Sequence, residues 1–221
     1  MSALLVLSIG MLLDAIFGEP KIIWNRAPHP VVIIGNIINW CDTNFNQGQN
    51  RLRNGVLTLG GLVAVSILLG YAIASIPQLW ILEGLSVAVL LAFRSLIDHV
   101  TAVAEALRLS LAEGRIMVAK IVGRDISNLD ESGVVRSTVE SAAENLSDGF
   151  IAPLFWYILL GLPGLFAYKV INTADSMIAH KSDRYEEFGW GTAKLDDIVN
   201  WVPARLSAMI ILLSNLKFDK I

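Results

Sequence analysis

The sequence predicts an all-α integral membrane protein in which several transmembrane helices carry a cytoplasmic helical layer. Three observations predict this class. Hydrophobic residues make up 54% of the 221 residues, above the ~45–50% of ordinary soluble domains. Residues 55–76 contain no charge, and about 20 apolar residues suffice to cross a bilayer as a helix. No region shows a sustained period-two alternation typical of a strand.

The membrane segments are expected at residues 1–17, 55–76, 79–97 and 150–171, with a further one beginning at 206. Residues 1–17 lack a positive leader and a cleavage site, so we interpret them as a retained helix rather than a secretory signal. Pro77-Gln78 makes a short turn, which predicts a transmembrane hairpin of 55–76 and 79–97. Together these segments predict one membrane-embedded domain over residues 1–221.

Polar residues gather in three stretches between these segments, at 18–54, 98–149 and 172–205. The Lys and Arg residues near the membrane ends favour a cytoplasmic place for the second and third stretches. That placement requires 150–171 to enter and leave the membrane on one side. The Gly161-Leu162-Pro163-Gly164 sequence favours such a helical hairpin because it breaks a helix at mid-depth.

Charge and cysteine content exclude several classes of function. The chain has 17 basic and 20 acidic residues, a net charge of −3, and therefore no basic field to hold nucleic acid. A single cysteine, Cys41, excludes an intrachain disulfide and a Cys-x-x-Cys site. A channel or carrier would place its polar residues inside the spans, so transport is the weakest alternative.

The second polar stretch predicts a helix that begins at Asp130 or Ser132 and ends near Asn145. Its apolar face is expected to contain Val134, Val135, Val139, Ala142 and Ala143. Its polar face carries Arg136, Glu140 and Glu144, with Asp148 one step further along the same line. Either Arg136 pairs with Glu140 on a solvated face, or Glu140, Glu144, Asn145 and Asp148 bind Mg²⁺ together with substrate phosphates.

The third polar stretch offers a second set of oxygen ligands. The Asn172-Thr173-Ala174-Asp175 sequence follows an apolar run, where it either caps a new helix or presents acceptors to a cation. Asp196 and Asp197 each share a helix face with Asn200, an arrangement that also suits Mg²⁺. Elsewhere, prolines on both sides of His29 fix its backbone, which allows a structural role or a role in proton transfer.

Many ordered motifs then resemble one family. They are Asp14 with Gly18-Glu19-Pro20; Pro28-His29-Pro30-Val31 with Gly35; Gly123-Arg124-Asp125 with Leu129-Asp130-Glu131; Val139-Glu140-Ser141, Ala143-Glu144-Asn145, Asp148-Gly149 and Ala152-Pro153-Leu154-Phe155; Gly161-Leu162-Pro163-Gly164, Tyr168, Asn172-Thr173 and Asp175-Ser176-Met177; Tyr185 with Phe188-Gly189-Trp190; and Leu195-Asp196-Asp197, Asn200 and Pro203-Ala204-Arg205-Leu206. In this order they resemble the CobD/CbiB family of cobalamin biosynthesis.

The resemblance implies a multi-pass adenosylcobinamide-phosphate synthase of the inner cell membrane, with its active site facing the cytoplasm. Such an enzyme uses ATP and Mg²⁺ to join the propionate carboxyl of adenosylcobyric acid, a corrinoid, to (R)-1-amino-2-propanol or its O-phosphate. We expect metal and base roles among Glu140, Glu144, Asp148, Asp175, Asp196 and Asp197, with His29 as a further catalytic residue. Substrate and phosphate binding is expected from Arg124, Arg136, Asn145, Asn172, Arg184, Tyr185, Asn200 and Arg205.

The sequence also departs from the family pattern. Members of the family continue well past the position of Ile221, so a partner chain that supplies the further segment is one expectation. The alternative is a truncated, non-catalytic membrane subunit or remnant of the same fold. Glu19 stands where the family usually has Asp, and Lys194 stands where Arg is usual, which loses bidentate geometry.

Overall fold

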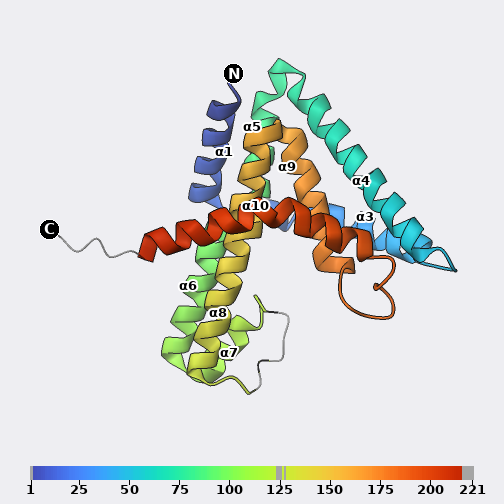
Figure 1. Ribbon diagram of the computed structural model, residues 1–221. Coiled ribbons are helices and arrows are strands. Elements are labelled where there is room, and N and C mark those ends of the chain that lie inside the picture. Colours follow the sequence, from blue (N-terminus) through green and yellow to red (C-terminus); the bar gives the residue numbers. More distant parts are fainter. Residues whose placement is uncertain (1, 123–125, 127, 216–221) are drawn as a thin grey trace.

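The computed structural model describes residues 2–122, 126 and 128–215, and every regular element in them is helical (Figure 1). The elements are α1 (Ala3–Phe17), α2 (Lys21–Trp24), α3 (Pro30–Phe45), α4 (Arg51–Ala74), η1 (Pro77–Leu79), α5 (Trp80–Leu90), α6 (Phe93–Leu109), α7 (Leu111–Val118), α8 (Glu131–Leu146), the π-helical turn η2 (Ser147–Ile151), α9 (Ala152–Ile178) and α10 (Trp190–Asn215). The described residues contain no strand, which confirms the all-α prediction.

Four helical stretches are long and apolar enough to cross a membrane: Arg51–Ala74, Pro77–Leu109, Glu131–Ile178 and Trp190–Ser214. On α4, Leu57 and Leu68 are 65% and 67% exposed, an apolar surface that suits lipid better than water. α1 is apolar but has only 15 residues, slightly fewer than the ~17 of the shortest transmembrane helices. The class of helical membrane protein is therefore confirmed, while the cytoplasmic layer stays a prediction.

A sharp bend at Gly161 divides α9 into two legs, as Figure 1 shows. Gly161 has φ 67° and ψ −155°, a backbone conformation that is essentially restricted to glycine. Pro163 then lies in the first turn of the second leg, where its missing N–H costs nothing. At the bend α4 comes very close, because a Cβ on Gly70 would lie 2.7 Å from the Pro163 Cα. The predicted break is thus present, and it brings Tyr168 of the second leg back to the Asp148 carbonyl just before the first leg. The placement of both ends on one side of the membrane stays a prediction.

The predicted membrane segment 79–97 lies within the apolar stretch Pro77–Leu109, but it is not one continuous helix, because α5 and α6 are separated by a break at Leu91 and Ala92. The break is stabilised by partners outside the segment. The Ala92 N–H donates to the Gly149 carbonyl at 3.1 Å, and the Phe93 N–H donates to the Asp14 carboxylate at 3.1 Å. Since these partners lie far away in the sequence, nothing local signals the break.

The pairing of helices also differs from the predicted hairpin of 55–76 and 79–97. Although η1 joins α4 to α5 directly, α4 packs mainly against α9, and α5 packs mainly against α1. Figure 1 shows α4 sloping away from α5 below their connection. Two apolar clusters hold this upper part together, one around Val87 and Leu165 and the other around Ile38 and Phe188.

Below this part, α6, α7 and α8 pack around Val103, Val118 and Val134. α8 begins as predicted, because the Asp130 carboxylate caps it by accepting a bond from the Gly133 N–H at 2.7 Å. Its predicted apolar face is wrong in part, since Val135 and Val139 are 48% and 62% exposed.

Ser137, Thr138 and Ser141 are buried on α8 instead. Ser137 and Thr138 donate to carbonyls one turn back, at 2.8 Å each, and the Ser141 hydroxyl donates to the Ile121 carbonyl, also at 2.8 Å. Because these hydroxyls have acceptors, small polar residues can occupy the buried face at little cost. This is why a pattern of apolar residues pointed to the wrong face.

The last helix, α10, crosses the molecule where the upper and lower parts meet, and it contacts α9, α4 and η2 (Figure 1). It continues without interruption from the polar residues after Trp190 into the apolar run that was predicted to begin at 206. Asn172 and Asp175 lie within the second leg of α9, so the first of the two alternatives for this sequence, that it caps a new helix, is wrong.

Candidate functional site

A polar cavity of about 620 Å³ lies where α8 and η2 meet the second leg of α9. Glu140, Glu144 and Asp148 line it from α8 and η2, and Lys169 and Asn172 line it from α9. The π-helical turn continues α8 past its expected end, and it keeps Asp148 at the cavity with the two glutamates. The structure therefore brings together the predicted line of carboxylates, and π-helical turns of this kind occur frequently at functional sites.

A second polar cavity, of about 550 Å³, adjoins the first. Both are lined by Ala92, Ile121 and Asn145, and the second adds Glu19 and Lys120. The break between α5 and α6 thus lies on both cavities, opposite the π-helical turn to which Ala92 is bonded. The predicted substrate residue Asn145 stands between the two spaces, and its amide donates to the Ser141 carbonyl at 2.8 Å.

Lys169 is the charged residue of the larger cavity that the sequence analysis missed. It is only 8% exposed, and its ammonium makes no ion pair or hydrogen bond with the described residues. Asp148 and Glu19 lie within electrostatic range of it. In the sequence Lys169 is a lone charge inside an apolar run, a pattern that more often marks a side chain reaching for the membrane surface.

The Tyr168 hydroxyl joins α10 to the cavity. It lies 3.0 Å from the Asn200 Oδ1 and 3.2 Å from the Asp148 carbonyl oxygen, and it donates to both. The Asn200 amide in turn donates to the Asp196 Oδ2 at 2.9 Å, which confirms the expected shared face of Asp196 and Asn200. The Asp196 Oδ1 is buried and has no hydrogen-bond partner among the described residues.

Asp175 and Asp197 lie at the same junction of α9 and α10. Asp175 is within electrostatic range of both Asp196 and Asp197, and the Asp197 side chain is exposed. The predicted acidic residues therefore form two groups, one on the cavity and one beside α10. Asp148 and Tyr168 connect the two groups.

The described residues contain no set of three or more His, Cys, Asp or Glu side chains placed to hold one metal ion. The carboxylates expected to take metal and base roles thus do not form a single cage. Mg²⁺ often needs only one or two carboxylates, because substrate phosphates and water complete its octahedral shell. The donors of the cavity fit that kind of site, and the predicted Mg²⁺ stays a prediction.

His29 has a structural contact on one side of its ring and an unused atom on the other. Its Nδ1 caps α3 by accepting a bond from the Val31 N–H at 3.3 Å, and its ring packs edge-on to Trp24. Its buried Nε2 has no hydrogen-bond partner in the described part of the chain. Burial lowers the pKa of His29, while the charge of Glu19 opposes this shift.

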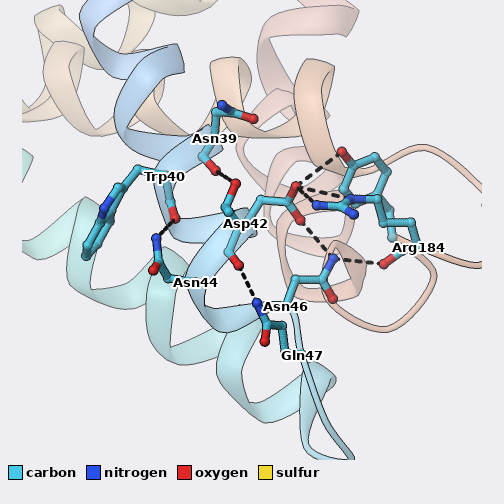
Figure 2. A network of polar contacts seen from close by, with 9 residues as sticks. Asn39, Trp40, Asp42, Asn44, Asn46, Gln47 and Arg184 are labelled. Atoms are coloured by element: carbon cyan, nitrogen blue, oxygen red, sulfur yellow. Dashed lines mark hydrogen bonds and ion pairs between the residues drawn. The ribbon is translucent and has the colours of Figure 1, made fainter.

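Arg184 and Tyr185 lie in a different network, and Figure 2 shows Arg184, Asp42 and Asn46 within it. The Arg184 guanidinium donates to the Asp42 Oδ2 at 2.6 and 3.2 Å, and the Tyr185 hydroxyl donates to the same oxygen at 3.4 Å. The Asn46 amide donates to the Asp42 Oδ1 and to the Arg184 carbonyl (Figure 2). The hydrogen bonds to Asp42 raise the pKa of Arg184 above the ordinary value of an arginine.

This network joins the end of α3 to the connection between α9 and α10, away from the residues that line the polar cavities. Asp42, which is 3% exposed, was missed because only its fold brings it to Arg184, 142 positions along the chain. The anion-binding role predicted for Arg184 and Tyr185 stays a prediction.

In the described part of the chain, the other predicted arginines do not line the larger cavity. Arg136 is exposed on α8. Arg205 stacks on the Trp201 ring at 4.0 Å and donates to the Trp201 carbonyl at 2.6 Å. Arg124, with its Gly123-Arg124-Asp125 motif, lies outside the described residues. Lys169 is therefore the cation that the described part of the chain contributes to the larger cavity.

The fold and the site define a helical membrane protein with a polar, carboxylate-lined cavity beside its membrane-type helices. A protein-family model described as CobD/Cbib protein matches residues 7–220. The chain belongs to the CobD/CbiB family.

Curated relatives of this chain are named "Cobalamin biosynthesis protein CobD". The protein of Brucella suis biovar 1 is 51% identical over 96% of this chain and 68% of its own length. That of Brucella melitensis biotype 1 is 50% identical with the same coverage. That of Rhodobacter capsulatus is 42% identical over 97% of this chain and 69% of its own length. No solved structure gives a significant match.

Proposed function

We propose that this chain acts in cobalamin biosynthesis, as the names of its relatives indicate. Its reaction is the ATP-dependent ligation of the propionate carboxyl of adenosylcobyric acid to (R)-1-amino-2-propanol or to its O-phosphate. The observation that carries the proposal is the larger cavity, where three carboxylates face a buried lysine. Its volume of about 620 Å³ falls in the range of ligand sites, about 300–1,000 Å³.

The chemistry explains why both kinds of charge are needed. A carboxylate is a poor acyl donor, so its oxygen first attacks the terminal phosphorus of ATP, and ADP leaves. The amine nitrogen then attacks the acyl carbon of the resulting acyl phosphate, the bond to the phosphate oxygen breaks, and the nitrogen loses a proton. Such a reaction requires cationic groups for the phosphates and a base for the amine.

Residues of the cavity can fill these roles. Glu144 lines the cavity and is exposed, so we assign it the role of the base that accepts the proton of the attacking amine. Glu140 and Asp148 would hold Mg²⁺, which neutralises phosphate charge when it is bound. Asn145 and Asn172 supply amide groups for polar parts of the substrates.

The proposal includes the inner cell membrane as location and the cytoplasm as the side of the cavity. Support comes from the α9 hairpin, because both of its ends lie at the cavity. Reporters placed at Glu113 in α7 and at Ser182 after α9 should therefore read out on the same, cytoplasmic side. Readouts on opposite sides would contradict this placement.

The test of the reaction uses membranes that contain only this chain. Adenosylcobyric acid and MgATP are supplied with aminopropanol or its O-phosphate in separate reactions, and the product is followed by mass. We expect amide formation, with Glu144→Gln slowing it by about 10²–10⁴-fold, as for the loss of a general base. Glu105→Gln, on the exposed surface of α6, is the matched control and should retain the wild-type rate.

Two outcomes would contradict parts of the proposal. Product formed by Glu144→Gln at the wild-type rate would remove the base role from Glu144. No product from correctly inserted wild-type chain would leave the alternative of a non-catalytic membrane subunit. Adding the part of a relative that this chain does not match, as a second chain, then tests whether a partner completes the site.

A further inference from the structure

We propose that Lys169 is the phosphate-binding residue of the larger cavity, with the Asn172 amide as its neighbouring donor. The choice of phosphate as the anion rests on the proposed function. The site itself is inferred from the geometry of α9. Neither the family match nor the names of the relatives assign a phosphate-binding residue.

The first step is the isolation of the Lys169 ammonium. A buried charge is costly unless it is paired and hydrogen-bonded. Lys169 is 8% exposed, yet no carboxylate among the described residues lies within ion-pair distance of it. Asp148 and Glu19 act on it only from further away. An ammonium held in this way lacks a close anionic partner, and a bound anion would supply one.

The second step is the direction of the side chain. Lys169 lines the polar cavity, and it also lines an apolar groove of about 330 Å³ formed with residues such as Ile34, Leu62 and Phe166. A lysine in such a place rests its methylene stem against apolar side chains and directs its ammonium to the polar space. The cavity is therefore the space in which Lys169 can meet a ligand.

The third step is the arrangement of the walls. Asn172 lies one turn after Lys169 on the same leg of α9 and lines the same cavity. Its amide makes no hydrogen bond to the described residues, so it is available to a ligand. The donors thus come from α9, and Glu140, Glu144 and Asp148 come from α8 and η2. A phosphate suits this arrangement, because Lys169 and Asn172 can donate to its oxygens, while the carboxylates would hold a divalent cation that neutralises phosphate charge.

The test measures binding to the purified full chain in detergent. The probes are MgATP, aminopropanol O-phosphate and aminopropanol, titrated by calorimetry into wild-type protein, Lys169→Met and Lys181→Met. Lys181 is an exposed lysine after α9 and serves as the matched control. We expect Lys169→Met to weaken at least one phosphate probe by about 10- to 100-fold, as for the loss of a charged hydrogen bond. Lys181→Met should change it by less than about twofold.

The two phosphate probes distinguish the source of the phosphate. Weaker binding of MgATP assigns Lys169 to the nucleotide, and weaker binding of aminopropanol O-phosphate assigns it to the second substrate. If wild-type protein binds neither phosphate probe, or if Lys169→Met binds both as wild type does, the inference is overturned.

Two additions keep the result interpretable. Lys169→Gln is measured in parallel with a melting curve, so that loss of binding is scored only in folded protein, and Lys169→Arg should restore part of the affinity. The amidation assay on wild-type chain is independent of these titrations. Phosphate binding that requires Lys169 without any amide product would refute the proposed ligase and leave the anion site standing.

Discussion

Replacing Tyr168 with Phe removes one oxygen from the junction between α10 and the cavity. Within the described part of the chain, the Asn200 Oδ1 accepts a hydrogen bond from the Tyr168 hydroxyl. The same hydroxyl also donates to the Asp148 carbonyl. Tyr168 is 1% exposed, so water has no direct access to replace it. Because Phe retains the ring, the variant tests the hydroxyl rather than the packing of the ring.

The magnitude follows from one hydrogen atom shared by two acceptors. A net hydrogen bond contributes about 0.5–1.5 kcal/mol, and a buried acceptor left without a donor adds about 1–3 kcal/mol. Asn200 is only partly buried, which places its share at the low end of this range. We therefore expect Tyr168→Phe to lower the free energy of unfolding by about 1–2 kcal/mol.

The assay combines unfolding by SDS in mixed micelles with the amidation rate. Tyr157→Phe is the matched control, because the Tyr157 hydroxyl is bonded to the Glu83 carboxylate at 2.6 Å and lies outside the polar cavities. Both variants should be destabilised, but Tyr168→Phe alone should lower the amidation rate of the folded fraction. Unchanged stability of Tyr168→Phe, or equal loss of rate in both variants, would refute the reasoning.

Three further predictions concern the bend, the α3 cap and the Asp42 network. Gly161→Ala should destabilise the protein by about 1–3 kcal/mol in SDS unfolding, because alanine is strained at φ 67° and ψ −155°; Gly60→Ala on open α4 surface should not. Since burial lowers the pKa of His29, stability is complete above its ordinary value of 6.5 and falls as the pH drops through the lowered value. His29→Asn should remove that slope in melting curves from pH 7 to 5, and an unchanged slope would assign it to other groups. Arg184→Met should destabilise the chain by leaving the buried Asp42 carboxylate without its cation, and in a double-mutant cycle Asp42→Asn should offset part of this loss.

The elements that the sequence predicted well are those with local causes. The α4 span follows from an uncharged run, the start of α8 follows from the cap at Asp130, and the bend in α9 follows from Gly161 and Pro163. The break at Leu91 and Ala92 was not predictable, because its stabilising bonds come from Asp14 and Gly149. Tertiary contacts there override a local preference for helix.

The site divides in the same way. Glu140, Glu144 and Asp148 were predicted because helical spacing alone places them on one line. All three line the larger cavity. Lys169 was missed because only the bend in α9 brings it to the cavity. Asp42 was missed because its partner, Arg184, lies far along the chain. A lone charge in an apolar run therefore has to be weighed against the fold, since its position decides whether it faces lipid, water or a ligand.

The bend at Gly161 explains how the chain places a polar cavity against membrane-type helices. The bend returns the second leg of α9 to the level of α8. Lys169 and Asn172, which follow the bend in the chain, therefore line the same cavity as the carboxylates that precede it. The break between α5 and α6 then opens beside the same space, because Ala92 lines both polar cavities. Two irregularities in otherwise apolar helices thus create one polar region, and α10 closes it through Tyr168 and Asn200. The bend and the break therefore contribute to the site together with its charged side chains, because the bend brings Lys169 to the cavity and the break brings Ala92 to it.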